Sequence, residues 1–211
     1  MNSKSKAVVL YVHGKGGSAA EAEHYRPLFP EADVVGFDYH SENPWSAKAE
    51  FSEKIAALRT NYDEISLIAV SIGAYFSMSA DISDSIRRAW LISPIVDMER
   101  LILSMLSWAG ETEEALQARK IIPTTFDEDL SWEYLQYVRS HPIQWRAPTE
   151  ILCGSTDSLQ SIETIRAFAR RFRAGVTVME GGELWFHTAE QMKFLDDWIR
   201  RRASNCTPCL A

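Results

Sequence analysis

The chain has few cysteines, and their positions do not indicate a metal or redox site. There are three in 211 residues. Cys153 lies within a predicted strand, where a thiol behaves as a small core residue. Cys206 and Cys209 form a C-x-x-C pair after the last predicted helix, whereas redox pairs of this kind usually begin a helix, and a structural zinc site needs two further ligands. We therefore expect no metal ion, and a flexible tail over residues 204–211.

An excess of positive charge and long apolar runs are also missing. Lysine and arginine total 22 against 29 aspartates and glutamates, which gives a net charge of −7. This balance argues against nucleic acid or an anionic membrane as the main partner. The chain does not open on a charged and then apolar leader, and its longest nearly apolar run, around Ser71, is too short to span a bilayer. We expect a cytoplasmic protein with a small-molecule partner, and the sequence does not indicate an oligomeric state.

What the sequence does have is an alternation of strand and helix patterns. Six short apolar, β-prone segments are separated by stretches with helical spacing, such as Phe51, Ile55 and Leu58. This order predicts an α/β fold with a doubly wound, mostly parallel six-stranded sheet, in one domain over residues 1–203. Ligands of such sheets bind beyond the carboxyl ends of the strands. The predicted strands cover residues 8–12, 33–37, 65–70, 89–93, 149–153 and 176–180.

The most informative residue is Ser71, which follows the apolar run 67–70 and precedes a helical pattern. A sharp strand-to-helix turn would expose its hydroxyl at the strand end, as a nucleophile elbow requires. Side chains two positions before and after such a serine come close together, and Ala69 and Gly73 are both small enough. A buried strand that contains serine and glycine by chance would give the same short pattern.

Two further segments end a predicted strand with suitable chemistry. The strand at 8–12 runs into the glycine-rich turn 13–17, where backbone N–H groups can point at a developing negative charge. The strand at 176–180 is followed by two glycines and then by His187, just before a helix. A candidate oxyanion loop, a candidate nucleophile and a candidate base therefore each follow a strand.

With these segments the sequence resembles the α/β-hydrolase superfamily, in particular its compact serine esterases and lipases. The resemblance covers nearly the whole chain, and the order serine, acid, histidine is also that of the superfamily. Ala69 departs from the pattern G-x-S-x-G at its first glycine, and the first two strands of the fold are absent. The matching segments are His13–Gly17, Ala69–Gly73, Gly154–Asp157 and Trp185–His187.

The resemblance also explains the one place where the alternation fails, between about residues 97 and 147. Roughly fifty residues separate two predicted strands there, which is far more than a crossover helix needs. In α/β hydrolases an insertion at this point forms a cap over the site, and this one is rich in aromatic side chains. Some of them would pack the cap onto the body and others would face the substrate.

The resemblance implies a catalytic triad. Serine is a poor nucleophile at neutral pH and needs a histidine base, which in turn needs a carboxylate. Among the five histidines, only His187 combines a loop, a preceding strand and the right chain order. Asp157, in the turn after the strand at 149–153, is the leading acid, although an aspartate there also suits a helix N-cap. The other histidines are His13, His24, His40 and His141. Asp97 and Asp38 are the alternative acids, and Glu180 and Glu183 lie near His187 in sequence but suit the fold less well than an acid in the loop after the preceding strand.

The oxyanion would be held by backbone N–H groups from two segments. One donor would be Ile72, directly after the nucleophile, and the other would come from Gly14, Lys15 or Gly16, with Lys15 preferred. The Lys15 side chain could attract an anionic substrate group, but a solvated surface lysine is the simpler expectation.

Together these residues predict a serine hydrolase that cleaves a carboxylic ester of a small apolar or aromatic substrate through an acyl-enzyme on Ser71, without a cofactor. The same triad would also serve a thioesterase, an amidase or an acyltransferase. A low-turnover ligand-binding member of the fold is the alternative from another class. The aromatic residues expected to contact the substrate are Trp108, Trp132, Trp145 and Trp185.

Overall fold

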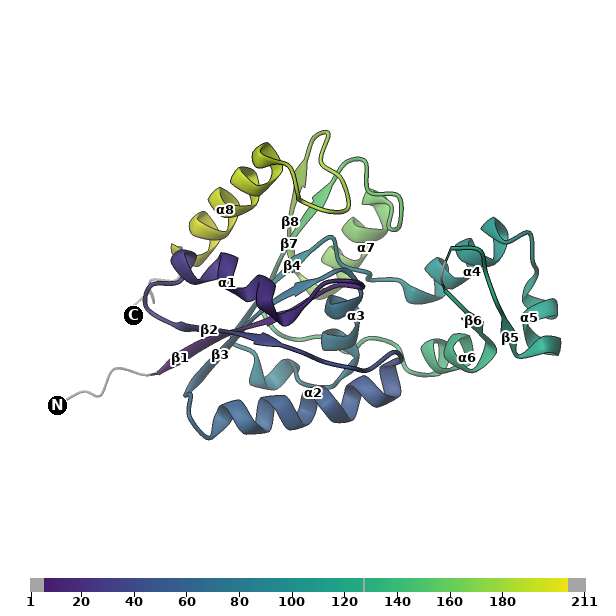
Figure 1. Cartoon of the computed structure of the whole chain (residues 1–211), viewed down its shortest axis with the longest axis horizontal. Coiled ribbons are helices and arrows are strands. Elements are labelled where there is room, and N and C mark those ends of the chain that lie inside the picture. Colours follow the sequence, from purple (N-terminus) through teal and green to yellow (C-terminus); the bar gives the residue numbers. More distant parts are fainter. Residues whose placement is uncertain (1–5, 127, 205–211) are drawn as a thin grey trace.

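A six-stranded parallel sheet forms the centre of the molecule (Figure 1). The computed structural model describes residues 6–126 and 128–204. The strand order is β2-β1-β3-β4-β7-β8, and every neighbouring pair is parallel. The predicted sheet is therefore confirmed. The strands are β1 Ala7–Val12, β2 Asp33–Phe37, β3 Glu64–Val70, β4 Arg88–Ile92, β7 Thr149–Gly154 and β8 Gly175–Met179.

Helices cover both faces of this sheet. α2, α3 and α7 pack on one face, and α1 and α8 pack on the other (Figure 1). Successive residues of a strand serve opposite faces: in β1, Leu10 points to the first layer and Val9 and Tyr11 to the second. The central strands β1, β3 and β4 are mostly apolar because both of their faces are covered, whereas the edge strands β2 and β8 are only partly buried. These helices are α1 Ala22–Tyr25, α2 Pro44–Arg59, α3 Ser71–Ser79, α7 Ile162–Phe172 and α8 Ala189–Ser204, with short 3-10 turns η1 Ala19–Glu21, η2 Arg26–Leu28 and η3 Ser83–Ser85.

Local sequence accounts for the start of the crossover helices. Asn43 caps α2, because its side-chain oxygen accepts the Ser46 N–H at 2.9 Å, and Pro44 occupies the first helical position. Ser161 caps α7 in the same way by accepting the Thr164 N–H at 3.2 Å. The side chains that α2 buries recur every three or four residues, as an amphipathic helix requires.

The residues between β4 and β7 form a separate small layer. Figure 1 shows it as the lobe beyond one side of the sheet, and Leu106, Leu116 and Leu135 fill its interior. The hairpin in this lobe was not predicted from the sequence, because two-residue strands are too short to show any alternation. The elements are α4 Met98–Trp108, α5 Glu113–Arg119, β5 Ile121–Ile122, β6 Leu130–Ser131 and α6 Trp132–Ser140.

No helix among the described residues combines the length and the apolar character that crossing a bilayer demands.

We expect the free energy of unfolding to be most sensitive to substitutions in the central strand β3. Leu67 is completely buried between β1 and β4. Leu67→Ala should lower the free energy of unfolding by about 2–5 kcal/mol, through lost burial and a residual cavity. Ile121→Ala, at a position that is 47% exposed, should change it by less than about 0.5 kcal/mol. Urea unfolding followed by circular dichroism measures both, and equal effects would contradict this description of the core.

Candidate active site

Ser71 lies where β3 ends and α3 begins. Its φ of 50° is in the left-handed region, which residues with a side chain rarely adopt. Val70 still pairs with Ile92 of β4, so the chain is regular strand up to the residue before the serine and turns sharply there. The serine side chain is 8% exposed. A strained strand-to-helix turn therefore carries this hydroxyl.

Glycines allow a second segment to reach this turn. A Cβ on Gly73 would lie 2.2 Å from the carbonyl oxygen of His13, which is backbone and cannot swing aside. A Cβ on Gly14 would lie 3.2 Å from the Cβ of the serine. Gly16 has a φ of 73°, so the loop also turns through the left-handed region. The glycine loop that follows β1 thus lies directly against the serine.

Lys15 and Ile72, the expected sources of oxyanion N–H groups, belong to the two segments that meet here. Ile72 is in the first turn of α3, where backbone N–H groups have no carbonyl partner within the helix. Lys15 is inside the turn that the Gly17 N–H closes on the Gly14 carbonyl at 3.1 Å. Its side chain is exposed and forms an ion pair with Glu128 of the insertion.

His187 lies in the loop between β8 and α8, and its ring is exposed. The ring Nδ1 is 2.8 Å from the Trp185 carbonyl oxygen and 3.4 Å from the Glu183 carboxylate. Among the hydrogen bonds of the described residues, none joins this ring to Ser71 or to Asp157. As far as the chain is described, the three expected triad side chains are therefore not linked by hydrogen bonds.

Asp157 is half-buried in the loop that follows β7. Its carboxylate accepts the Leu159 N–H at 2.8 Å and also the Gln160 N–H. Burial raises the pKa of this carboxyl above its ordinary value, and these two hydrogen bonds offset only part of the rise. The N-cap of α7 is Ser161, so helix capping does not account for Asp157.

The alternative acids have other surroundings. Asp97 caps α4 by accepting the Arg100 N–H at 2.9 Å. Asp38 is exposed and follows β2, which β1 separates from the elbow strand. Neither is therefore placed better than Asp157 to orient a histidine that follows β8.

The other histidines are engaged elsewhere. His13 is buried, with its ring stacked on Tyr39 at 4.4 Å between centroids and its Nδ1 2.9 Å from the Gly14 carbonyl oxygen. Its ring therefore packs against the start of the glycine loop. His24 places its Nε2 2.8 Å from Asp196 Oδ1 on α8. The remaining two, His40 and His141, are exposed.

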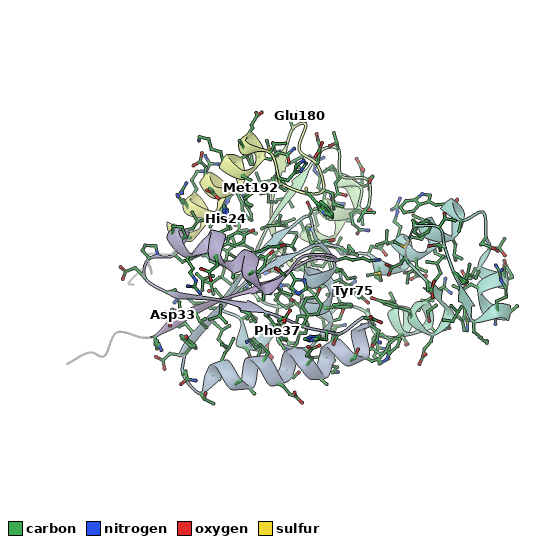
Figure 2. All side chains as sticks on the ribbon, viewed as in Figure 1. His24, Asp33, Phe37, Tyr75, Glu180 and Met192 are labelled. Carbon is green, nitrogen blue, oxygen red and sulfur yellow. The ribbon has the colours of Figure 1, made fainter. Side chains whose placement is uncertain are left out.

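A cavity of about 360 Å³ opens beside Ser71. It lies between the glycine loop with α1 on one side and the β8–α8 loop with α8 on the other, and most of its wall is apolar. Figure 2 shows His24 of α1 next to Met192 of α8, and both line it. As far as the structure describes the chain, no lining residue belongs to the insertion. The cavity has room for a small aromatic group.

The four tryptophans expected at the substrate occupy different surroundings. Trp185 is 63% exposed and lines the cavity. Trp145 is buried and donates its indole N–H to Thr149 Oγ1 at 2.7 Å, so it packs the end of the insertion onto β7. Trp132 is half-buried against the core, and Trp108 is 55% exposed on the insertion.

Sequence reasoning missed the buried side chain of Gln160. Its Oε1 accepts the N–H groups of Val96 and Asp97 at 3.1 and 3.0 Å, and its Nε2 donates to the Asp97 and Leu159 carbonyl oxygens at 3.3 and 3.0 Å. This side-chain amide therefore links the loop that carries Asp157 to residues 96–97, where the insertion begins. No sequence pattern marks it, since glutamine in a loop is usually exposed.

The structure describes one of the three cysteines, Cys153. Cys153 is buried in β7, and burial raises the pKa of its thiol to about 11. Cys206 and Cys209 lie outside the described residues. Within residues 6–126 and 128–204, no three histidine, cysteine, aspartate or glutamate side chains gather as metal ligands would.

Comparisons with known proteins identify the fold. No protein-family model and no curated protein sequence matches the chain. Solved structures do match. Est1E from Butyrivibrio proteoclasticus superposes with a TM-score of 0.75 at 13% identity, over 97% of this chain and 89% of that one.

Two further structures agree. Alpha/beta hydrolase domain-containing protein 10 from mouse has a TM-score of 0.72 at 14% identity, over 97% of this chain and 92% of its own. XC6422 from Xanthomonas campestris, described as an α/β serine hydrolase without a lid, has a TM-score of 0.65 at 14% identity, over 99% and 86% of the two chains. The resemblance noted from the sequence is thus confirmed for the fold.

The raised pKa of Asp157 predicts a pH-dependent cost in stability. A carboxyl whose pKa is higher in the folded than in the unfolded protein opposes folding once the pH exceeds its unfolded value, about 3.9. Asp157→Asn removes the charge and should therefore raise the melting temperature at pH 7. The gain should disappear as the pH falls below about 4. Melting curves of both proteins across this range test it, with Asp38→Asn as the exposed control, and a variant less stable at every pH would contradict it.

Proposed function

From the α/β-hydrolase fold, we propose that this chain is a serine hydrolase that cleaves carboxylic esters through an acyl-enzyme on Ser71. The observation that carries the proposal is the serine itself. It is held in a left-handed backbone conformation at the end of the central strand, in contact with a glycine loop and at the wall of a cavity. Strained backbone of this kind is concentrated at functional sites, and here it coincides with a glycine loop and a cavity.

The proposed reaction uses these segments in two steps. The Ser71 oxygen attacks the ester carbonyl carbon while His187 takes its proton, and the oxyanion accepts N–H groups from Lys15 and Ile72. Collapse expels the alcohol, which leaves with the proton from the histidine. Water, deprotonated by the same histidine, then hydrolyses the acyl-enzyme. Asp157 is the proposed partner of the imidazole.

This mechanism requires the His187 ring to leave the Trp185 carbonyl and to turn toward the serine. Trp185 and Phe186 of the same loop already line the cavity beside Ser71. The change therefore concerns a ring and a short exposed segment. Catalytic hydrogen bonds are often long or misaligned before substrate binds, so the exposed ring is compatible with a role as base.

Size and lining of the cavity support a small apolar or aromatic substrate. About 360 Å³ accommodates one aromatic ring with a short chain, and the wall offers Tyr25, Phe186 and Met192. A structure of Est1E holds ferulic acid, which makes aromatic acyl esters reasonable first substrates for this chain. Thioesters and amides remain alternatives, because the triad does not choose the leaving group.

One observation favours a second candidate, a ligand-binding protein with little turnover. The His187 ring makes its hydrogen bond within its own loop instead of to a triad partner. Covalent labelling separates the two candidates, because a binding protein needs no activated serine.

The first test is covalent labelling of the serine. A fluorophosphonate should label the protein at one site, and peptide mapping should place the adduct on Ser71. Ser71→Ala should abolish labelling and turnover of p-nitrophenyl acetate and butyrate. His187→Ala should lower both by at least about 10³-fold, since the proton then has no acceptor. An adduct elsewhere, or full activity in His187→Ala, would overturn the assignment.

The choice of acid follows from the same assay. Asp157→Asn should lower kcat by a factor on the order of 10⁴ if it orients the imidazole. Glu183→Gln is the matched comparison, because Glu183 is the carboxylate nearest to His187 in the structure. Near-normal turnover in Asp157→Asn together with a large loss in Glu183→Gln would move the role to Glu183.

Tryptophan substitutions distinguish substrate contact from packing. Trp185→Ala should raise KM for aromatic esters about tenfold with little change in kcat or melting temperature, because Trp185 lines the cavity and is exposed. Trp145→Ala should lower the melting temperature and leave the preference among esters unchanged, because this indole is buried at the end of the insertion, against β7. The reverse pattern would place the substrate at the insertion.

A further inference from the structure

The cavity beside Ser71 carries a carboxylate in a wall that is otherwise mostly apolar. Glu21 ends the short turn η1 and lines the cavity together with Tyr11 and Tyr25. Within the described residues, the hydrogen-bond partners of this carboxylate are neutral: the Tyr11 hydroxyl donates to Oε2, and the Ser18 N–H donates to Oε1 at 3.2 Å. Its negative charge is therefore hydrogen-bonded without being neutralised.

Tyr11 fixes the place of this carboxylate. The tyrosine is 2% exposed on β1, and its ring stacks on Tyr25 at 5.1 Å between centroids. Burial raises the pKa of Tyr11, so its hydroxyl stays protonated and donates. Gly17 of the oxyanion loop bounds the other side, where a Cβ would lie 2.9 Å from Glu21 Oε1. The carboxylate is thus held between the Tyr11 hydroxyl and the loop beside the serine.

The remaining charges of the cavity wall already have partners of opposite sign. Lys15 pairs with Glu128 of the insertion. His24 lies 2.8 Å from Asp196 Oδ1, so a proton on this ring would be matched by that carboxylate. A ligand that enters the cavity therefore meets a surplus of negative charge, with Glu21 as the carboxylate on the lining itself.

We propose that this cavity selects esters whose apolar group ends in an amine, and that Glu21 binds the resulting ammonium. The inference rests on the proposed function, since the cavity adjoins the proposed nucleophile. The apolar wall takes the carbon chain, and the ammonium forms a charge-assisted hydrogen bond to a carboxylate that Tyr11 and Ser18 hold in place. A substrate that ends in a carboxylate meets like charge and is rejected.

Three esters of one length provide the test: p-nitrophenyl hexanoate, p-nitrophenyl 6-aminohexanoate and mono-p-nitrophenyl adipate. The wild type should prefer the amine to the carboxylate by a factor on the order of 100 in kcat/KM, mostly through KM, and added salt should reduce this ratio. Glu21→Gln should bring the amine and carboxylate esters to within about threefold of each other. Acetate esters of alcohols with the same three ends repeat the series on the leaving-group side.

Two variants make the result specific to the charge at this position. Glu21→Asp keeps the charge and should retain the preference for the amine. Glu23→Gln removes a charge two residues away, where the side chain pairs with Arg26 at 2.9 Å and does not line the cavity, and it should retain the wild-type ratio.

The outcomes separate this inference from the proposed function. Hydrolysis that depends on Ser71 but shows no preference in either series, or a preference that survives in Glu21→Gln, overturns the inference alone. Absence of turnover that depends on Ser71 for every ester, with no labelling of the serine by fluorophosphonate, overturns the proposed function.

Discussion

The candidate site depends on a close approach between two backbone segments, the turn after β3 and the loop after β1. A side chain at Gly73 would collide with the His13 carbonyl oxygen at 2.2 Å, so the two backbones can meet only through glycine. Parallel neighbours end at the same edge of a sheet, and β1 is paired with β3 along the whole length of β1. The left-handed turn at Ser71 costs about 1–3 kcal/mol, and the ladders on both sides of β3 supply the surroundings that hold it.

The elements around this contact could be predicted because their signals are local. Most strands are recognised in the sequence as apolar runs between polar turns, and the predicted strand 33–37 has the bounds of β2. The glycine turn, Ser71 and His187 could be picked out because each follows the end of a predicted strand. The sequence places a helical pattern after Ser71, whereas α3 begins at Ser71 itself, because an elbow passes directly from strand into helix and has no capping residue that would mark the start.

The cavity could not be predicted, because its lining comes from residues that meet only in the tertiary structure. Tyr11 lies within a predicted strand, and in the structure Glu21 forms a capping box with Ser18, so neither position marks a cavity in the sequence. The sequence analysis predicted substrate contacts from tryptophans of the long insertion, whereas the cavity beside the serine lies between α1 and α8. The orientation of the His187 ring could not be predicted from the sequence either, because a few weak contacts and not core packing determine the position of an exposed side chain.

The loops that carry the proposed acid, Asp157, and the proposed base, His187, are hydrogen-bonded to each other near the strand ends from which they start. Thr156 donates from its N–H and its hydroxyl to the Gly182 carbonyl, at 2.9 and 2.7 Å, and the Gly181 N–H donates to Ser155 Oγ at 2.8 Å. These bonds make the first residues after β7 and β8 one unit. Beyond Gly182 the segment exposes Glu183, Trp185 and His187 and is anchored inside by Phe186. In the proposed mechanism, rotation of His187 about this anchor would therefore leave the starts of both loops in place, and Asp157 and Ser71 would keep their positions.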